Sequence, residues 1–260
     1  KEGNTNANAS LLYGDMNRYP WYRMRCEDDV LLTAPALTAE LFRMDERGFV
    51  KERQVENKIV VTCRYVSVLM SAILKAKGIP ARSRAGFAPY FREGVSMDHW
   101  INQYYNEKEK RWVTFDADGF YEESGMPLSQ YDMPKESFDW AAGAYLAVRR
   151  KETDGRQYLY ADRLGTCSLP ALVRYLVYDF HALMNHELTY SFLPAYLDGR
   201  LDRLTQEELR ELDRLAEWML DADQYFDRLC EVWEHERKFR ILNSPLVGAY
   251  SHGAEGSGHC

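Results

Sequence analysis

The sequence predicts an α+β fold with an additional helical region in its C-terminal half. Apolar residues recur at helical spacing between Val66 and Leu74, and two strand-like runs surround a short polar turn at residues 106–109. From Ser137 onward, helical spacing of apolar residues dominates. The 260 residues are 46% apolar and 13% aromatic, which is enough for a packed core. We therefore expect a helix packed on an antiparallel sheet, followed by further helices.

The charge distribution argues against nucleic acid and membranes as partners. The net charge is −7, from 40 acidic and 33 basic residues, and no run is rich in Lys and Arg. The longest mostly apolar stretch, residues 59–74, contains Arg64 and is too short to span a bilayer. We therefore expect a soluble, cytoplasmic protein. The chain begins at Lys1 rather than Met, so a removed leader stays open as an alternative.

The cysteines favour reduced thiols over a disulfide framework or a metal site. Their number, five, is odd, and their spacing matches no set of metal ligands. They are Cys26, Cys63, Cys167, Cys230 and Cys260. We expect neither a metal nor another cofactor.

The composition along the chain predicts four segments. Residues 1–10 are polar and Asn-rich and residues 253–260 are rich in Gly, Ser and His, so both are expected to be flexible. The sequence changes character near residue 130. We therefore predict an α+β core at residues 11–130 and a helical region at residues 131–252, packed on that core.

One long amphipathic helix is predicted in the helical region. Thr205 and Glu208 have the spacing of a capping box, and apolar residues then recur at intervals of three and four as far as Trp233. The pattern predicts a single helix of at least about six turns. We interpret it as a core or lid helix, with a coiled-coil dimer seam as the alternative, and the oligomeric state stays open.

Cys63 is predicted at the start of a buried helix. Thr62 can serve as the N-cap, the helix covers residues 64–77, and Gly78 and Pro80 end it. The unpaired N–H groups and the dipole at a helix N-terminus favour an anion. A thiol placed there ionises more readily, and the backbone amides can face a developing oxyanion.

His99 and Asp116 are predicted to face each other across a β-hairpin. If Tyr105 pairs with Lys110 around the turn at residues 106–109, His99 lies directly opposite Asp116. A carboxylate in that place can orient the imidazole, and an oriented imidazole can activate a thiol. The interpretation depends on the register, because a slip by one residue moves one side chain to the other face.

These residues occur within strings that resemble the transglutaminase-like superfamily over about residues 57–119. The strings are Cys63, Leu-Lys-Ala-Lys-Gly-Ile-Pro-Ala-Arg at residues 74–82, Gly86, Asp98-His99-Trp100, and Trp112-Val-Thr-Phe-Asp116. The resemblance implies a papain-like core in circularly rearranged order, with the Cys at a helix start and His and Asp on successive strands. It also implies a catalytic triad of Cys63 as thiol nucleophile, His99 as base and acid, and Asp116 as the group that orients His99.

The implied activity is acyl transfer from an amide, a peptide bond or a glutamine side chain, through a thioester to an amine or to water. The substrate would be a peptide, a protein or a small amide. The sequence has Val60-Val61-Thr62 where family members often have small residues before the nucleophile, and it lacks the calcium-binding signatures of large animal transglutaminases. Asn57, Gln54 and Trp21 are the candidates for a side-chain oxyanion donor.

Alternatives remain open at this point. A cysteine peptidase or amidase would use the same residues with water as acceptor, and a catalytically silent transglutaminase-like binding module would keep only the fold. Arg82 and Arg84 are expected to pair with carboxylates, with an acidic substrate as the alternative. His181, His186 and Glu187 lack the spacing of a zinc protease, so we expect a structural role for them.

Overall fold

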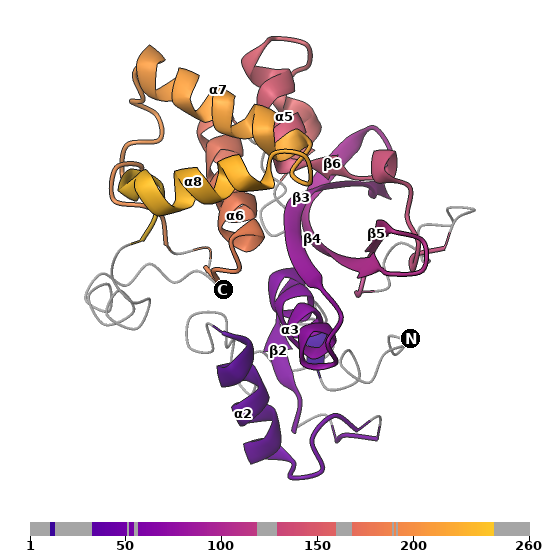
Figure 1. Cartoon of the computed structure of the whole chain (residues 1–260). Helices are drawn as coiled ribbons and strands as arrows, with labels where there is room; N and C mark the ends of the chain where they lie inside the picture. The colour runs from indigo at the N-terminus through magenta and orange to yellow at the C-terminus, as the bar shows by residue number, and fades with distance from the viewer. Residues whose placement is uncertain are drawn as a thin grey trace. The chain divides into compact units, whose positions relative to one another are not determined.

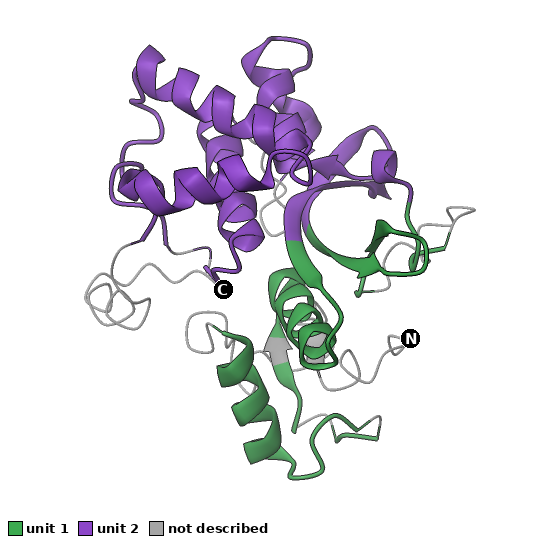
Figure 2. Ribbon diagram, viewed as in Figure 1, with its two compact units in different colours: residues 1–83, 100–133, 249–260 green, residues 84–99, 134–248 purple. Residues whose placement is uncertain are grey.

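The structure of the protein is a computed structural model (Figure 1). It describes residues 11–13, 33–50, 52–54, 57–118, 129–159, 168–188, 190 and 192–241. The chain divides into two compact units (Figure 2). Unit 1 comprises residues 1–83, 100–133 and 249–260, and unit 2 comprises residues 84–99 and 134–248. The predicted division of the chain near residue 130 stays a prediction.

Helices and an antiparallel sheet are both present, so the α+β class is confirmed. The α-helices are α2 (Ala34–Met44), α3 (Cys63–Ala76), α5 (Ala141–Arg149), α6 (Leu169–Leu183), α7 (Gln206–Leu220) and α8 (Phe226–His235). The short 3-10 helices are η3 (Lys135–Ser137), η4 (Gly155–Gln157) and η5 (Arg237–Phe239). The strands are β1 (Leu11–Tyr13), β2 (Ile59–Val61), β3 (Ala81–Arg92), β4 (Val95–Asn106), β5 (Arg111–Phe115), β6 (Asp139–Trp140) and β7 (Tyr158–Leu159).

The main sheet has the strand order β5-β4-β3-β6, and β7 pairs with β4. The pairs β4–β5 and β3–β6 are antiparallel, whereas β7 runs parallel to β4. A separate two-stranded sheet is formed by the parallel strands β1 and β2. No helix among the described residues is long and apolar enough to cross a bilayer.

The β4–β5 hairpin exists, but its predicted register was wrong. Tyr105 pairs with Trp112 rather than with Lys110, and Asn106 pairs with Arg111. If the ladder is continued by one pair, Ile101 lies opposite Asp116. His99 precedes Ile101 by two residues in β4. The direct opposition of His99 and Asp116 is therefore not the arrangement in the hairpin.

The side chain of Asn106 explains this register. Its Oδ1 accepts hydrogen bonds from the backbone N–H groups of Lys108 at 3.0 Å and Glu109 at 3.3 Å. An Asn in this arrangement closes a turn from its first position, so Asn106 becomes the last paired residue of β4. Lys110 then completes the turn with a positive φ of 54°. The polar turn is as long as predicted but begins one residue later.

The core of unit 1 is formed around α3. Val66 and Leu69 on the predicted apolar face of α3 are buried, and Met70, Ile73 and Leu74 pack against the same cluster. The other buried residues of the cluster come from α2, β2, α3, β5 and the segment directly after β5. They are Leu37, Leu41, Ile59, Val61, Tyr65, Phe115 and Ala117. The predicted helix is confirmed, and Gly78 with a positive φ of 77° follows its C-terminus.

Unit 2 contains the C-terminal helices. Helix α5 packs against α6 and α7, and α7 packs against α8 (Figure 1). The capping box is confirmed: Thr205 Oγ1 accepts from the Glu208 N–H at 3.2 Å, and Glu208 Oε2 accepts from the Thr205 N–H at 2.7 Å. Thus α7 begins where the sequence predicted the helix start.

The prediction of one long helix after Thr205 was wrong. Helix α7 ends at Leu220, turns follow at residues 221–225, and α8 begins at Phe226. Asp221 and Asp223 lie in these turns, and Asp has a low helix propensity.

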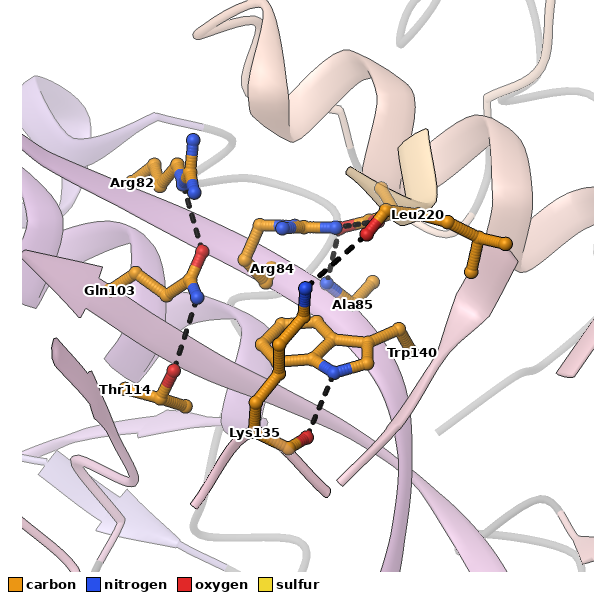
Figure 3. Close-up of polar contacts among 9 residues, drawn as sticks. Arg82, Arg84, Ala85, Gln103, Thr114, Lys135, Trp140 and Leu220 are labelled. Atoms are coloured by element: carbon orange, nitrogen blue, oxygen red, sulfur yellow. Dashed lines mark hydrogen bonds and ion pairs between the residues drawn. The ribbon is translucent and has the colours of Figure 1, made fainter. Parts of the chain in front are cut away.

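A buried ion pair joins β3 to α6 within unit 2. Arg84 Nε and Nη2 each donate to a carboxylate oxygen of Asp179 at 2.8 Å, and the Ala85 N–H donates to Asp179 Oδ1 at 2.9 Å. Figure 3 shows the Arg84 side chain next to the indole of Trp140, with the guanidinium carbon 4.7 Å from the ring centroid. The expectation that Arg84 pairs with a carboxylate is confirmed.

Arg82 contacts an amide and an aromatic ring in unit 1. Its Nε donates to Gln103 Oε1 at 2.8 Å, and Gln103 Nε2 donates to Thr114 Oγ1 at 3.1 Å (Figure 3). The guanidinium carbon lies 3.9 Å from the centroid of the Trp112 ring. Arg82 therefore links the side chains of β3, β4 and β5.

A histidine pair links α6 to η5. His181 Nε2 lies 2.8 Å from the carbonyl oxygen of Phe239, so this nitrogen carries a proton and donates. His181 Nδ1 therefore accepts, and its partner at 2.9 Å, His186 Nδ1, donates. Trp233 packs against both rings. The two histidines thus have the structural role expected for them.

The first prediction concerns the ion pair. Asp179→Ala leaves the guanidinium of Arg84 buried without this carboxylate, so we expect the free energy of unfolding to fall by about 3–5 kcal/mol. Urea denaturation measures the change. Glu217→Ala is the matched control, because the exposed Arg150–Glu217 pair contributes only about 1 kcal/mol or less. Equal losses in the two variants would contradict the importance of the buried pair.

The second prediction concerns acid stability. Burial, with a further contribution from His186, lowers the pKa of His181 to about 3, while the bond to the Phe239 carbonyl opposes the shift. Because the unfolded chain binds the proton more readily, the free energy of unfolding decreases as the pH falls below about 6.5. It keeps decreasing until the pH reaches about 3. His181 should contribute a loss of about 2 kcal/mol between pH 7 and pH 5. Urea denaturation at both pH values should give a flatter pH dependence for His181→Gln; an unchanged slope would contradict the assignment.

Candidate active site

Cys63 is the first residue of α3. Thr62 occupies the N-cap position with extended backbone angles, φ −97° and ψ 173°, and its carbonyl oxygen accepts from the Tyr65 N–H at 3.0 Å. The N-cap position predicted for Thr62 is confirmed, but its side chain makes no capping hydrogen bond. Cys63 itself is 6% exposed. The thiol thus lies at the N-terminus of a buried helix, where helix dipole and backbone amides favour an anion.

Two serines of α3 bind β4 within unit 1. Ser67 Oγ donates to the carbonyl oxygen of Ile101 at 2.8 Å. Asn102 Nδ2 donates to the Ser67 carbonyl oxygen and to Ser71 Oγ, both at 2.8 Å. These contacts fix the helix that carries Cys63 against the strand. The sequence signal for them is the pair Ser67 and Ser71, four residues apart on an otherwise apolar helix.

Arg64, the residue after Cys63, is a buried charged residue whose surroundings were not predicted from the sequence. It is fully buried, and its guanidinium carbon lies 4.6 Å from the Tyr65 ring centroid and 5.9 Å from that of Trp100. Aromatic faces attract a cation at this distance. A charged residue inside an apolar helix segment is the signal that could have identified it, because a buried Arg is rare.

Asp116 lies directly after β5 in unit 1 and is fully buried. Its N–H donates to the Gln130 carbonyl oxygen at 3.0 Å, and its Oδ1 accepts from the Asp118 N–H at 3.0 Å. The carboxylate is therefore held by its own turn. Asp118 is half-buried, so Asp116 is the more shielded of the two carboxylates.

His99 lies in β4 within unit 2 and is fully buried. The ring of Phe91 meets the imidazole edge-on with 4.7 Å between ring centroids, and Tyr90 lies 6.4 Å away. The aromatic rings restrict the orientation of the imidazole. Cys63 and Asp116 belong to unit 1 and His99 to unit 2, so the convergence of the three side chains stays a prediction.

The oxyanion candidates lie in different surroundings. Gln54 is exposed, whereas Asn57 is half-buried and donates its N–H to the Gln54 carbonyl oxygen at 3.0 Å. The Asn57 carbonyl oxygen accepts from Arg53 Nη1 at 2.8 Å. Trp21 lies outside the described residues. The role of these residues as oxyanion donors stays a prediction.

A comparison with protein families finds a match over the part of the chain that contains the three candidate catalytic residues. Residues 50–117 match the sequence model of the transglutaminase-like superfamily. The match includes Cys63, His99 and Asp116, and it ends before the C-terminal helices. No curated protein and no solved structure matches the chain. The predicted resemblance is confirmed over residues 50–117, which are similar to the transglutaminase-like superfamily.

Proposed function

We propose that the protein is a cysteine-dependent acyltransferase or amide hydrolase that works through a thioester on Cys63. The observation that carries the proposal is the position of Cys63 as the first residue of a buried helix, inside the segment that matches the transglutaminase-like superfamily. His99 and Asp116, the other two residues that the chemistry requires, lie in the same segment. The substrate is a peptide, a protein or a small amide.

The proposed reaction has two steps that share one intermediate. The Cys63 thiolate attacks the amide carbonyl carbon, the carbon–nitrogen bond breaks, and the leaving amine takes a proton from the His99 imidazolium. An amine or water then attacks the thioester while the imidazole takes its proton, and the thiolate leaves. Asp116 orients the imidazole in both steps. Transfer and hydrolysis differ only in the second nucleophile, so a peptidase or amidase belongs to the same proposal.

A catalytically silent binding module is the second candidate. The observation that favours it is burial, because Cys63 is 6% exposed and both His99 and Asp116 are fully buried. A protein in which no acyl group can reach the Cys63 sulfur would have the fold but would not catalyse the reaction. Reactivity of the thiol toward a small reagent separates the two candidates.

The third prediction concerns thiol reactivity at pH 6. An activated Cys63 should be alkylated by iodoacetamide much faster than an ordinary thiol, and His99→Ala should slow this labelling by roughly tenfold or more. Mass spectrometry of the Cys63 peptide over time measures the rate.

Cys230 provides the internal control for this experiment. Burial and the neighbouring acidic residues Asp227 and Glu234 raise the pKa of its thiol, so its labelling at pH 6 should be slow and independent of His99. Labelling of Cys63 as slow as that of Cys230, in both the wild-type protein and His99→Ala, would favour the silent module.

The fourth prediction concerns Cys63→Ala. The substitution removes a single sulfur atom at a helix start, so the free energy of unfolding should change by only about 1 kcal/mol. Amide cleavage and transfer should disappear, because Cys63 supplies the nucleophile in the proposed reaction. Urea denaturation and product analysis measure the two effects. A loss of several kcal/mol would identify Cys63 as a core residue instead.

A further inference from the structure

The segment of β4 that leads to His99 is held by other elements of unit 2. Ser96 and Met97 pair with Tyr158 and Leu159 of β7 in a parallel ladder. Ser96 Oγ also donates to Asp139 Oδ2 at 2.5 Å. The backbone before His99 is therefore fixed by residues that follow it in the sequence by 40 positions or more.

Asp98, the residue before His99, is held by α6. The hydroxyl of Tyr175 donates to Asp98 Oδ2. Tyr175 is 2% exposed, and its ring packs against Phe87 with 5.0 Å between ring centroids. Phe87 in turn packs against Tyr158 at 4.9 Å. The hydroxyl of Tyr175 is thus held in place by aromatic packing on β3 and β7.

This contact bears directly on the orientation of His99. Successive side chains of a strand leave the backbone on opposite faces, so the anchor on Asp98 fixes the peptide unit from which the imidazole departs. Phe91 contacts the imidazole itself at 4.7 Å. Displacement of a reacting group by about 1 Å can cost about a hundredfold in rate, so a fixed backbone at this point matters for catalysis.

We propose that the hydrogen bond from Tyr175 to Asp98 is a positioning contact for His99. The inference rests on the proposed function and assigns a task in it to α6, which lies outside the transglutaminase-like segment. Tyr175 and Asp98 touch no reacting atom in this account. They act through the backbone of β4, and their loss should reduce the ability of His99 to activate Cys63.

Tyr178 offers a matched control on the same helix. It is 1% exposed, and its hydroxyl donates to the Tyr190 carbonyl oxygen at 2.6 Å rather than to β4. Tyr175→Phe and Tyr178→Phe therefore each remove one buried tyrosine hydroxyl from α6. Only Tyr175→Phe removes the contact with the residue before His99.

The fifth prediction is tested by measuring the rate of Cys63 alkylation from pH 5 to pH 9 in the full chain. Tyr175→Phe should lower the rate at pH 6 by roughly tenfold and move the pH profile toward that of His99→Ala. Tyr178→Phe should leave the profile within about twofold of the wild type, even where urea denaturation shows a similar loss of stability. Asp98→Asn retains an acceptor oxygen for Tyr175 and should keep most of the rate.

Several outcomes overturn the inference. Equal pH profiles for Tyr175→Phe and Tyr178→Phe would reduce the contact to a structural role. A rate for Asp98→Asn as low as that of His99→Ala would assign the effect to the charge of Asp98. If Tyr175→Phe does not fold, Asp98→Ala breaks the same contact from the strand side and is read in the same way. Slow labelling of Cys63 in the wild-type protein would overturn the proposed function and, with it, this inference. Fast labelling of the wild-type protein together with equal profiles for the two tyrosine variants would overturn this inference alone.

Discussion

The burial of α3 determines where Cys63, the candidate nucleophile, lies. Its apolar face packs into the core of unit 1, and Ser67 ties it through Ile101 to β4. The side chain of Thr62 contributes no cap to this helix. Tertiary packing rather than local capping therefore fixes the helix start, and with it the position of Cys63. The helix N-terminus then supplies the dipole and the backbone amides that thiolate chemistry uses.

The C-terminal helices hold the part of β3 and β4 that belongs to unit 2. Asp179 of α6 binds Arg84 of β3, and Tyr175 of the same helix binds Asp98 of β4. The second of these contacts is made by the residue directly before His99. The helical region thus does more than extend the fold, because it constrains the strand that carries the candidate base. A transglutaminase-like segment alone would lack these contacts.

Local signals allowed the helix of Cys63 and the capping box of α7 to be predicted from the sequence. The register of the β4–β5 hairpin could not, because the side chain of Asn106 decides where the turn begins. The break between α7 and α8 was missed because apolar spacing continues across residues 221–225. The bond between Arg84 and Asp179 joins residues 95 positions apart, and spacing carries no information over that distance. For the candidate site, the sequence supplies residue types and their order as a prediction, but it does not contain the surroundings of Arg64 and Asp98.

The proposed reaction requires that Cys63 carries an acyl group during turnover. The most direct measurement is mass spectrometry of the intact chain and its peptides after incubation with glutamine-containing peptides and an acid quench. If the thioester forms on Cys63, the Cys63 peptide should carry an acyl adduct that hydroxylamine removes and that His99→Ala diminishes. No adduct on Cys63 under conditions where amide is consumed, or an adduct on another cysteine instead, would contradict it.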